Sequence, residues 1–203
     1  MWKHVIQMLK RSMDILGSIV GIIFLSPLLL LVAILIKLDS KGKVFFSQVR
    51  VGLNGKEFKI YKFRSMVENA ESLRTKLEDK NEATGPMFKI KKDPRITKVG
   101  RFIRKTSIDE LPQLVNVLKG EMSLVGPRPS LPSEVINFEP WMLKRFKVKP
   151  GLTCFWQVSG RNNIGFNEWM EMDIKYVNEI SLSTDIKLIL KTITLLFGDK
   201  NAF

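Results

Sequence analysis

The residues most able to perform chemistry are an adjacent pair of acids, Asp109 and Glu110, which open an amphipathic segment and follow several cations. A carboxylate at a helix N-terminus stays ionised at neutral pH and faces N–H groups that also bind phosphate. Asp109 could therefore attack a phosphoryl centre. Glu110, together with Asp109, could hold Mg²⁺, which prefers carboxylate and phosphate oxygens, and Arg104 could neutralise charge in the transition state.

The same acids also have a purely structural explanation. Residues 107–110 fit a capping box, in which the Ser107 side chain caps the helix and Glu110 reaches back to the Ser107 backbone. Pro112 weakens this explanation slightly, because a helix start at Asp109 would place the proline more comfortably within the first turn. From these residues alone, a catalytic role and a capping role both stay open.

Two further motifs carry polar side chains on turns. In Gly126-Pro127-Arg128-Pro129, two prolines fix the backbone around Arg128, so its guanidinium is presented with little entropy left to lose. Gln157 and Arg161 follow another turn, Lys149-Pro150-Gly151, and lie among aromatic residues. Taken singly, each pattern also fits an ordinary exposed turn.

A β-hairpin is the first element expected to position these side chains. Val44–Val51 and Lys56–Met66 flank Asn54-Gly55, the dipeptide favoured in two-residue hairpin turns. One face of the second strand carries, in order, Phe58, Ile60, Lys62 and Arg64. An apolar start and a basic end suit a core edge that meets an anionic ligand, although two solvated charges at a strand end would give the same pattern.

The rest of the chain predicts helices and one long loop. The helices cover residues 67–79, 111–120, 135–149, 166–180 and 185–197, and the loop covers residues 80–94. The helix over 135–149 mixes aromatic and basic side chains, which suits a membrane surface or a core-packed helix with a basic outer face. Ser183 or Thr184 is expected to cap the last helix.

Composition excludes several kinds of enzyme. The chain has 203 residues, with 33 Lys and Arg against 20 Asp and Glu, so its formal charge is +13, yet its mean hydropathy is +0.02. With His4 as the single histidine and Cys154 as the single cysteine, Ser-His-Asp and Cys-His nucleophile systems and ordinary zinc sites are excluded. The lone thiol also fits a reducing cytosolic face.

The apolar residues that offset the charge are concentrated near the N-terminus. The 22 residues Ile15–Ile36 contain no ionisable side chain, and a helix of that length rises about 33 Å, enough to cross a hydrocarbon core of about 30 Å. However, Ser26-Pro27 lies at the midpoint, where proline should kink a helix. Because both flanks are basic, the positive-inside rule would keep both in the cytoplasm. A re-entrant helix that bends at Ser26-Pro27 satisfies both observations, and a kinked spanning helix is the alternative.

Five ordered motifs give the sequence a specific resemblance over nearly the whole chain. It resembles the bacterial sugar transferase family, the monotopic phosphoglycosyl transferases, through Ser26-Pro27, Tyr61-Lys62-Phe63-Arg64-Ser65-Met66, Thr106-Ser107-Ile108-Asp109-Glu110-Leu111-Pro112-Gln113-Leu114, Val125-Gly126-Pro127-Arg128-Pro129 and Lys149-Pro150-Gly151-Leu152-Thr153. The resemblance is to the minimal form, with a catalytic domain and its re-entrant helix. It therefore implies an α+β fold, with a re-entrant membrane helix over residues 1–40. A cytoplasmic catalytic domain over 41–203 would contain the hairpin and several amphipathic or interfacial helices.

The resemblance also implies an activity and a location. Family members transfer a sugar 1-phosphate from a UDP-sugar to a polyprenyl phosphate, typically undecaprenyl phosphate, at the cytoplasmic face of the bacterial inner membrane, and release UMP. This is the first membrane step in making exopolysaccharide, O-antigen or a related glycoconjugate. The first acid of the family's Asp-Glu pair is the nucleophile, which is Asp109 here, and the second, Glu110, is associated with Mg²⁺. By their positions in the motifs, the candidates for phosphate or nucleotide contacts are Lys62, Arg64, Arg104, Arg128, Gln157 and Arg161.

A non-enzymatic alternative is a membrane-anchored basic adaptor that binds acidic lipid or nucleic acid. It explains the charge of +13, but it explains neither the Asp-Glu pair nor a proline-fixed arginine, and no nucleic-acid motif is present. The residues do not name the sugar or the pathway, since a few side chains can distinguish one hydroxyl from an acetamido group. They also leave open whether the protein forms a homo-oligomer.

Overall fold

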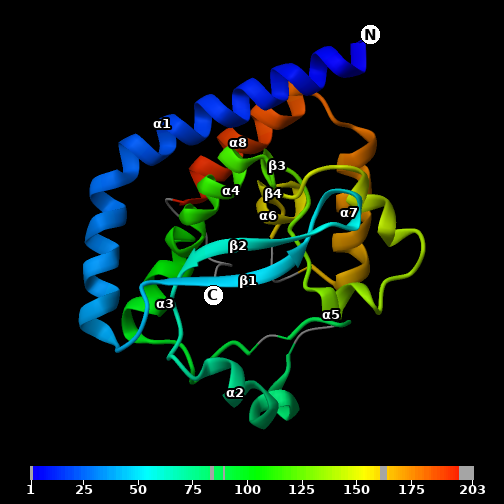
Figure 1. Ribbon diagram of the computed structural model, residues 1–203. Coiled ribbons are helices and arrows are strands. Elements are labelled where there is room, and N and C mark those ends of the chain that lie inside the picture. The colour runs from blue at the N-terminus through cyan, green and yellow to red at the C-terminus, as the bar shows by residue number, and fades with distance from the viewer. Residues whose placement is uncertain (1, 83–84, 89, 161–163, 197–203) are drawn as a thin grey trace.

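The computed structural model of the protein describes residues 2–82, 85–88, 90–160 and 164–196 (Figure 1). A long N-terminal helix, α1 (Trp2–Asp39), lies along one side of a small domain that contains short helices and two small sheets. The predicted combination of an apolar N-terminal helix with a small domain of helices and strands is confirmed. The division into residues 1–40 and 41–203 stays a prediction.

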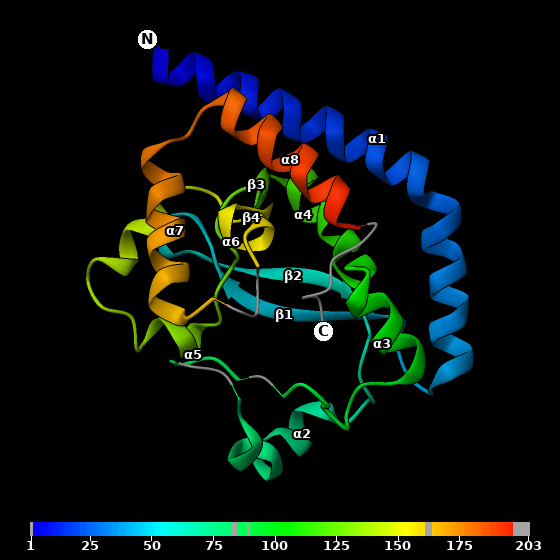
Figure 2. The same cartoon turned by 180° about the vertical axis from the view of Figure 1, so that it is seen from behind.

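Helix α1 is bent and contains a proline. Figures 1 and 2 both show a bend in α1 past its midpoint, and Pro27 lies in the second half of the helix. Proline has no N–H for the carbonyl of Ile23, four residues earlier, and the Ser26 hydroxyl donates to that carbonyl oxygen at 2.8 Å. The side chain of Ser26 thus replaces the missing backbone donor, and the helix continues through the bend.

Both halves of α1 pack against the same domain. In the first half, Asp14 accepts hydrogen bonds from the Ser123 hydroxyl at 2.9 Å and from the next backbone N–H at 2.8 Å. In the second half, Ile36 is buried in a cluster with Phe63 and Ile103. The domain therefore holds α1 on both sides of the bend.

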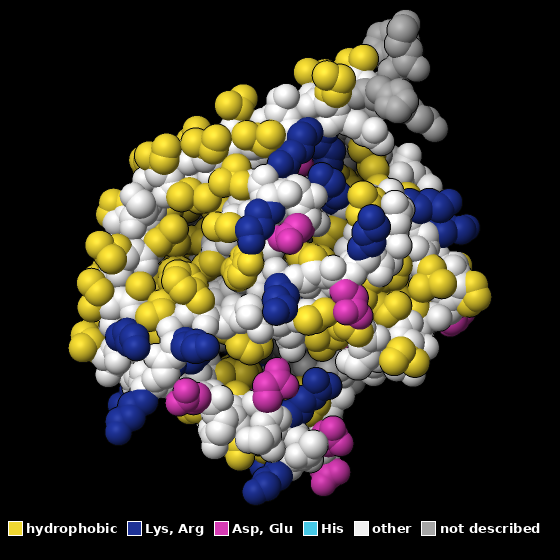
Figure 3. Space-filling model, in the orientation of Figure 1, with side chains coloured by type: hydrophobic (Ala, Val, Ile, Leu, Met, Phe, Trp, Pro, Cys, Tyr) yellow, Lys and Arg dark blue, Asp and Glu magenta, His cyan; other side chains and the backbone are white. Residues whose placement is uncertain are grey.

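The outer face of α1 is apolar and exposed. Between Val5 and Asp39 the helix is long and apolar enough to cross a membrane, and only 11% of its most apolar window is buried. Phe24, for example, is 82% exposed, and Figure 3 shows hydrophobic side chains along the length of α1. This face is consistent with membrane association.

Strands β1 (Phe45–Val51) and β2 (Glu57–Phe63) form the predicted antiparallel hairpin. Val51 pairs with Glu57, which leaves residues 52–56 in the connection, so the expectation of a two-residue turn is wrong. Asn54 and Gly55 do adopt positive φ angles of 55° and 76°. They form part of a longer loop because Gly52 N–H donates to the Lys56 carbonyl at 2.8 Å.

A second sheet joins two distant segments in parallel. Strands β3 (Ser123–Val125) and β4 (Gly151–Thr153) are three residues each. The strands approach so closely that a Cβ on Gly151 would lie 2.1 Å from the Gly126 nitrogen. This contact fixes the start of the loop that carries Arg128.

The other helices are short until the C-terminal pair. They are α2 (Ala70–Arg74), α3 (Lys98–Lys105), α4 (Leu114–Lys119), α5 (Pro132–Val135), α6 (Phe155–Val158), α7 (Phe166–Asn178) and α8 (Leu182–Leu196), and 3-10 turns cover Leu53–Gly55, Thr75–Lys80, Ile108–Gln113 and Met142–Lys147. Both views place α8 beside the first half of α1 (Figures 1 and 2).

Two helix predictions need correction. The segment over 135–149 is not one helix: α5 ends at Val135, and a 3-10 helix begins at Met142 with both Met142 and Arg145 buried, which favours the core-packed alternative. Helix α8 begins earlier than expected, because Ser181, rather than a later residue, accepts from the Thr184 N–H at 3.1 Å.

Candidate active site

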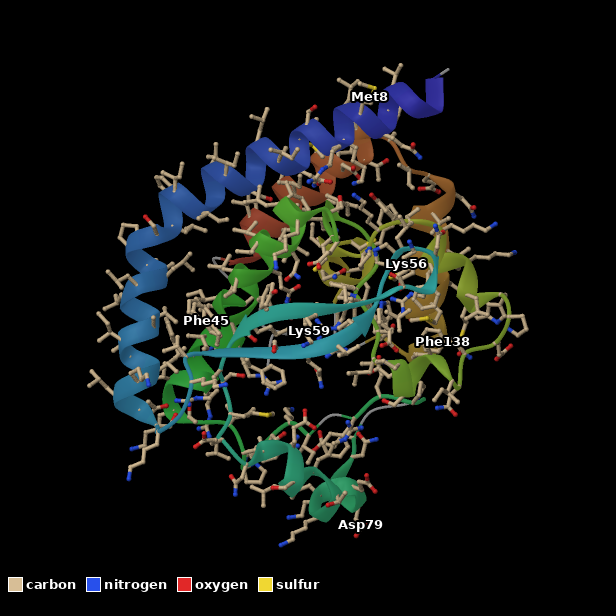
Figure 4. The ribbon with its side chains drawn as sticks, viewed as in Figure 1. Met8, Phe45, Lys56, Lys59, Asp79 and Phe138 are labelled. Carbon is tan, nitrogen blue, oxygen red and sulfur yellow. The ribbon has the colours of Figure 1, made fainter. Side chains whose placement is uncertain are left out.

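The segments predicted to carry chemistry meet in one cleft. It is lined by residues of β1, β2, the 3-10 helix Ile108–Gln113, the Arg128 loop, β4 and α6, namely Arg50, Ile60, Lys62, Glu110, Gln113, Arg128, Pro129, Gly151, Leu152 and Gln157. The hairpin that contributes Lys62 crosses the middle of the molecule in Figure 4, between the labelled Phe45 and Lys56.

Glu110 is the anion at the centre of this cleft. Its Oε1 accepts from Lys62 Nζ at 2.6 Å and from Arg128 Nη1 at 3.1 Å. Burial alone would raise the pKa of Glu110, but the positive charges of Lys62 and Arg128 outweigh burial and hold that pKa well below its usual range. Glu110 is therefore ionised at any physiological pH.

Asp109 has the opposite environment. Its residue is only 8% exposed, and none of the residues that the structure describes donates a hydrogen bond to its carboxylate. Burial, reinforced by the negative charge of Glu110 and opposed by Lys62, raises the pKa of Asp109 from 3.8 to about 6. A buried carboxylate without donors keeps its lone pairs available, which is unusual in a folded protein.

The backbone before the acids is strained in a way that rules out the capping explanation. Ser107 adopts a left-handed conformation with φ of 56°, and its side chain does not cap the following 3-10 helix. The Glu110 carboxylate contacts Lys62 and Arg128 instead of reaching back to the Ser107 backbone. The capping-box explanation is therefore wrong, and left-handed non-glycine residues of this kind cluster at functional sites.

The Arg128 loop is held by its carbonyl oxygens as well as by its prolines. Four of them accept hydrogen bonds from elsewhere: Pro127 from Gly151 N–H at 2.9 Å, Arg128 from Arg145 Nη2 at 2.6 Å, Pro129 from Arg50 Nη1 at 3.3 Å and Ser130 from Val51 N–H at 2.9 Å. The predicted stiff presentation of the Arg128 guanidinium is therefore supported by contacts far from the loop in sequence.

Arg50 belongs to the site and was missed by the sequence motifs. It lines the cleft, its Nη2 donates to Gln48 Oε1 at 2.7 Å, and its buried Nε has no hydrogen-bond partner among the described residues. Burial and the charge of Arg128 lower its pKa to about 10. The hairpin register could have revealed it, because Arg50 lies opposite Phe58 and so shares the face that carries Lys62.

The other predicted residues have different positions. Gln157 lines the cleft, and Arg104 lies near enough to lower the pKa of Asp109 by its charge. Arg64 is not brought to the cleft: its Nη2 donates to the Ser40 carbonyl at 2.7 Å and hydroxyl at 2.9 Å, at the C-terminal end of α1. Carbonyl groups at a helix C-terminus attract cations, which accounts for this placement. Arg161 lies outside the described residues.

The carboxylates present can account for only part of a metal's coordination shell. Within the described ranges, no group of three or more His, Cys, Asp and Glu side chains is placed to hold a metal ion. Asp109 and Glu110 do offer oxygens to which no described residue donates. On Glu110 this oxygen is Oε2, because Lys62 and Arg128 both contact Oε1. Such a pair fits Mg²⁺, which in proteins often takes one or two carboxylates and completes its shell with phosphate oxygens and water.

The arrangement can bind a phosphate ester next to a nucleophile. Arg50, Lys62 and Arg128 provide more positive charge than Glu110 neutralises, in a partly buried cleft where such charges act strongly on a ligand. Asp109 lies beside them as a desolvated carboxylate. Phosphoryl transfer through a covalent aspartyl intermediate is the chemistry that these groups can perform.

Comparisons with known proteins agree with this chemistry. The profile of a family described as bacterial sugar transferase matches residues 5–199. The galactosyl transferase CpsE of Streptococcus agalactiae serotype III is 50% identical over 185 residues, 91% of this chain and 41% of the relative. The exopolysaccharide production protein ExoY of Rhizobium meliloti is 40% identical over 190 residues, 92% of this chain and 84% of the relative.

The name of a third relative contains a lipid phosphate. The undecaprenyl-phosphate galactose phosphotransferase of Salmonella typhimurium is 43% identical over 203 residues, 96% of this chain and 42% of the relative. The chain thus spans less than half the length of several curated relatives and most of the length of ExoY. Since the family profile covers nearly the whole chain, the protein belongs to the bacterial sugar transferase family.

Proposed function

We propose that the protein transfers a sugar 1-phosphate from a UDP-sugar to undecaprenyl phosphate and releases UMP, as the first membrane step of exopolysaccharide or related glycoconjugate synthesis. The buried Asp109 carboxylate, to which no described residue donates, carries this proposal, because it lies beside a cluster of cations. The names of two relatives agree: one is a UDP-galactose-lipid carrier transferase of Erwinia amylovora, and the other is the undecaprenyl-phosphate galactose phosphotransferase of Salmonella typhimurium.

In the first step, an Asp109 oxygen attacks the phosphorus that bears the sugar. A P–O bond to Asp109 forms, the bond from that phosphorus to the bridging oxygen breaks, and UMP leaves with the bonding electrons. Lys62 and Arg128 stabilise the charge that accumulates on the departing phosphate. Glu110 stays ionised and keeps both cations in place, so its carboxylate is already engaged. The Asp109 carboxylate, with its higher pKa, is the more basic of the two and suits the role of nucleophile better.

In the second step, a phosphate oxygen of undecaprenyl phosphate attacks the same phosphorus. The bond to Asp109 breaks, and the carboxylate is regenerated with its electron pair, so no net proton is required. Arg50 and Arg104 are available to hold the incoming phosphate near Asp109.

Mg²⁺ is the cofactor that the carboxylate pair fits. Asp109 and Glu110 would hold it, and when bound it would neutralise negative charge on the diphosphate and on the leaving phosphate. Glu110 is suited to this because the two cations on its Oε1 keep it ionised.

We infer that α1 enters the cytoplasmic leaflet, bends and returns to the same face. The domain holds both Asp14 and Ile36, on opposite sides of the bend, and a spanning helix would have to carry one of these halves away from the domain. Ser26 compensates for the backbone donor lost at the bend, so the bend is tolerated in an apolar medium. The exposed outer face then contacts lipid.

Accessibility labelling tests this topology. Single cysteines replacing Lys3 and Lys43 should both react with an impermeant reagent from the cytoplasmic side only. The native Cys154 can stay, because it is buried and burial raises the pKa of its thiol well above the usual range. Reaction of the two positions from opposite sides would establish a spanning helix.

Turnover assays test the reaction itself. Purified protein with Mg²⁺, undecaprenyl phosphate and a panel of UDP-sugars should release UMP with at least one sugar. Without the lipid acceptor, the protein should gain the mass of one sugar phosphate. Asp109→Asn should lose both signals, whereas the matched control Asp79→Asn, at an exposed position, should keep them. Vesicle binding without any UMP release would favour the adaptor function instead.

A further inference from the structure

Arg145 is a charged side chain buried completely in the domain. Its side chain is 1% exposed, and its Nη2 forms an ion pair at 2.7 Å with Asp173 of α7, whose side chain is 0% exposed. Three rings surround the guanidinium, with centroids 5.6 Å away at Phe138, 5.8 Å at Phe146 and 5.5 Å at Trp169. Such a desolvated pair needs its remaining donors satisfied.

Both terminal nitrogens of the Arg145 guanidinium donate to the Arg128 loop, whereas its buried Nε has no hydrogen-bond partner among the described residues. Nη2 also donates to the Arg128 carbonyl oxygen at 2.6 Å, and Nη1 donates to the Ser130 hydroxyl. The Arg145 guanidinium therefore binds the loop at the residues on both sides of Pro129. Arg145 thus holds the backbone of Arg128, while the Arg128 side chain reaches Glu110, with Nη1 3.1 Å from Oε1.

A second contact links the same aromatic cluster to Arg128. Trp156 stacks on Trp169, with ring centroids 4.8 Å apart, and the Arg128 guanidinium lies 5.9 Å from the Trp156 ring. The cluster thus supports Arg128 through its backbone, by way of Arg145, and through its side chain, by way of Trp156.

A purely structural role does not explain this arrangement. Apolar residues of similar volume often replace a buried ion pair without loss of stability, and Met142 and Met170 already pack in this cluster. An apolar side chain could not donate to the Arg128 carbonyl or to the Ser130 hydroxyl, so these two bonds are what the buried charge adds.

We propose that Arg145, anchored by Asp173, is a positioning residue for phosphoryl transfer: it sets the loop so that the Arg128 guanidinium meets Glu110 and the substrate phosphate. The proposal rests on the proposed function. Arg145 itself contacts no reacting atom and acts through Arg128.

A double-mutant cycle separates this role from a structural one. Arg145→Lys keeps the charge but loses the planar fork, and displacement of a positioned group can lower turnover by about 10–100-fold, mainly in kcat. In an Arg128→Ala background the same change should cost no more than about twofold. Independent losses that multiply would overturn the proposal.

The stability of the same four proteins provides the internal control. Any loss of folding stability caused by Arg145→Lys should persist in the Arg128→Ala background, whereas its effect on kcat should vanish. Arg101→Lys, at an exposed position on α3, should leave both quantities unchanged. If Arg145→Lys fails to fold, Ser130→Ala, which removes one of the two loop contacts, takes its place in the cycle.

Hydrogen exchange tests the proposal without any turnover. Arg145→Lys should speed amide exchange over residues 126–131 in the substrate-free protein and leave exchange in α8 unchanged. Unchanged exchange over 126–131 would overturn the positioning role. Absence of UMP release by the unaltered protein would instead refute the proposed function, so the two failures are distinguishable.

Discussion

Asp109→Asn should make the folded protein more stable while it abolishes transfer. The folded pKa of about 6 exceeds the ordinary value of 3.8, and a difference of about 2 pH units corresponds to about 3 kcal/mol of penalty for the ionised form. Because Asp109 is only 8% exposed, solvent screens little of this penalty. Asparagine has nearly the same shape and no charge, so it removes the penalty.

Because the pKa of Asp109 is raised in the folded state, the stability gained by Asp109→Asn depends on pH in a defined direction. Above about pH 6 the carboxylate of Asp109 is ionised in the folded and unfolded states, so the full penalty is present. Below about pH 4 the group is protonated in both states, and the penalty is absent. The unaltered protein should therefore lose stability relative to Asp109→Asn as the pH rises from about 4 to about 6.

Glu110→Gln provides a matched change of opposite sign. The pKa of Glu110 is lowered in the folded state because Lys62 and Arg128 outweigh its burial, so its ionised form stabilises the fold above its unfolded pKa. Replacing it should destabilise the protein at pH 8, and the difference should shrink only once the pH falls below the ordinary glutamate pKa of 4.5. Both variants lose one carboxylate, so opposite changes in stability would show that the environment of each carboxylate, rather than its loss, decides the sign.

Thermal unfolding in detergent measures these differences directly. At pH 8, about 3 kcal/mol should raise the Tm of Asp109→Asn by about 6–12 °C in a protein of this size. UMP release by the unaltered protein should also fall as the pH drops below about 6, because protonated Asp109 is no nucleophile. A Tm for Asp109→Asn below that of the unaltered protein at pH 8, or a gain independent of pH, would refute this reasoning.

Three further changes test the packing around the site. Lys10→Met should cost about 3–5 kcal/mol in denaturant unfolding, because it leaves the fully buried Asp185 carboxylate without its ion pair; adding Asp185→Asn should recover much of the loss. Gly126→Ala should cost about 1–3 kcal/mol, since its Cβ would lie 2.3 Å from a backbone carbonyl oxygen. A Cβ on Gly165 would meet no atom of the described residues within 4 Å, so Gly165→Ala should be neutral; equal costs would contradict the geometry. Ser26→Ala should cost about 1 kcal/mol, because the carbonyl freed by the following proline loses its donor; no change in unfolding would show that this bond contributes nothing.

The parts of the site that the sequence predicts well are encoded by neighbouring residues. Alternation around Asn54-Gly55 defines a hairpin that brings Lys62 to the cleft, and two prolines mark the stiff loop of Arg128. The bend of α1 (Figure 1) follows from the chemistry of proline alone. Each of these features needs no knowledge of what packs against it.

The features that escape prediction depend on distant partners. Arg64 shares a predicted strand face with Lys62, yet it binds the end of α1, because only the packed structure decides which negative group a cation meets. Arg50 is part of no motif and reaches the cleft through its register across the hairpin. The ion pair of Arg145 and Asp173 joins elements whose contact no local pattern announces.

The first turns of α1 connect this apolar helix to elements of the candidate site. Lys10 donates to the carbonyl of Val125, the residue before the Arg128 loop, at 2.9 Å. Arg11 donates to the carbonyls of residues 117 and 118 at 2.6 and 2.7 Å, near the end of α4, which continues the 3-10 helix that carries Asp109. These charges, expected to retain the flank in the cytoplasm, thus also bind the domain. Because α1 supplies these donors, its removal would leave carbonyls beside the candidate site without their hydrogen bonds.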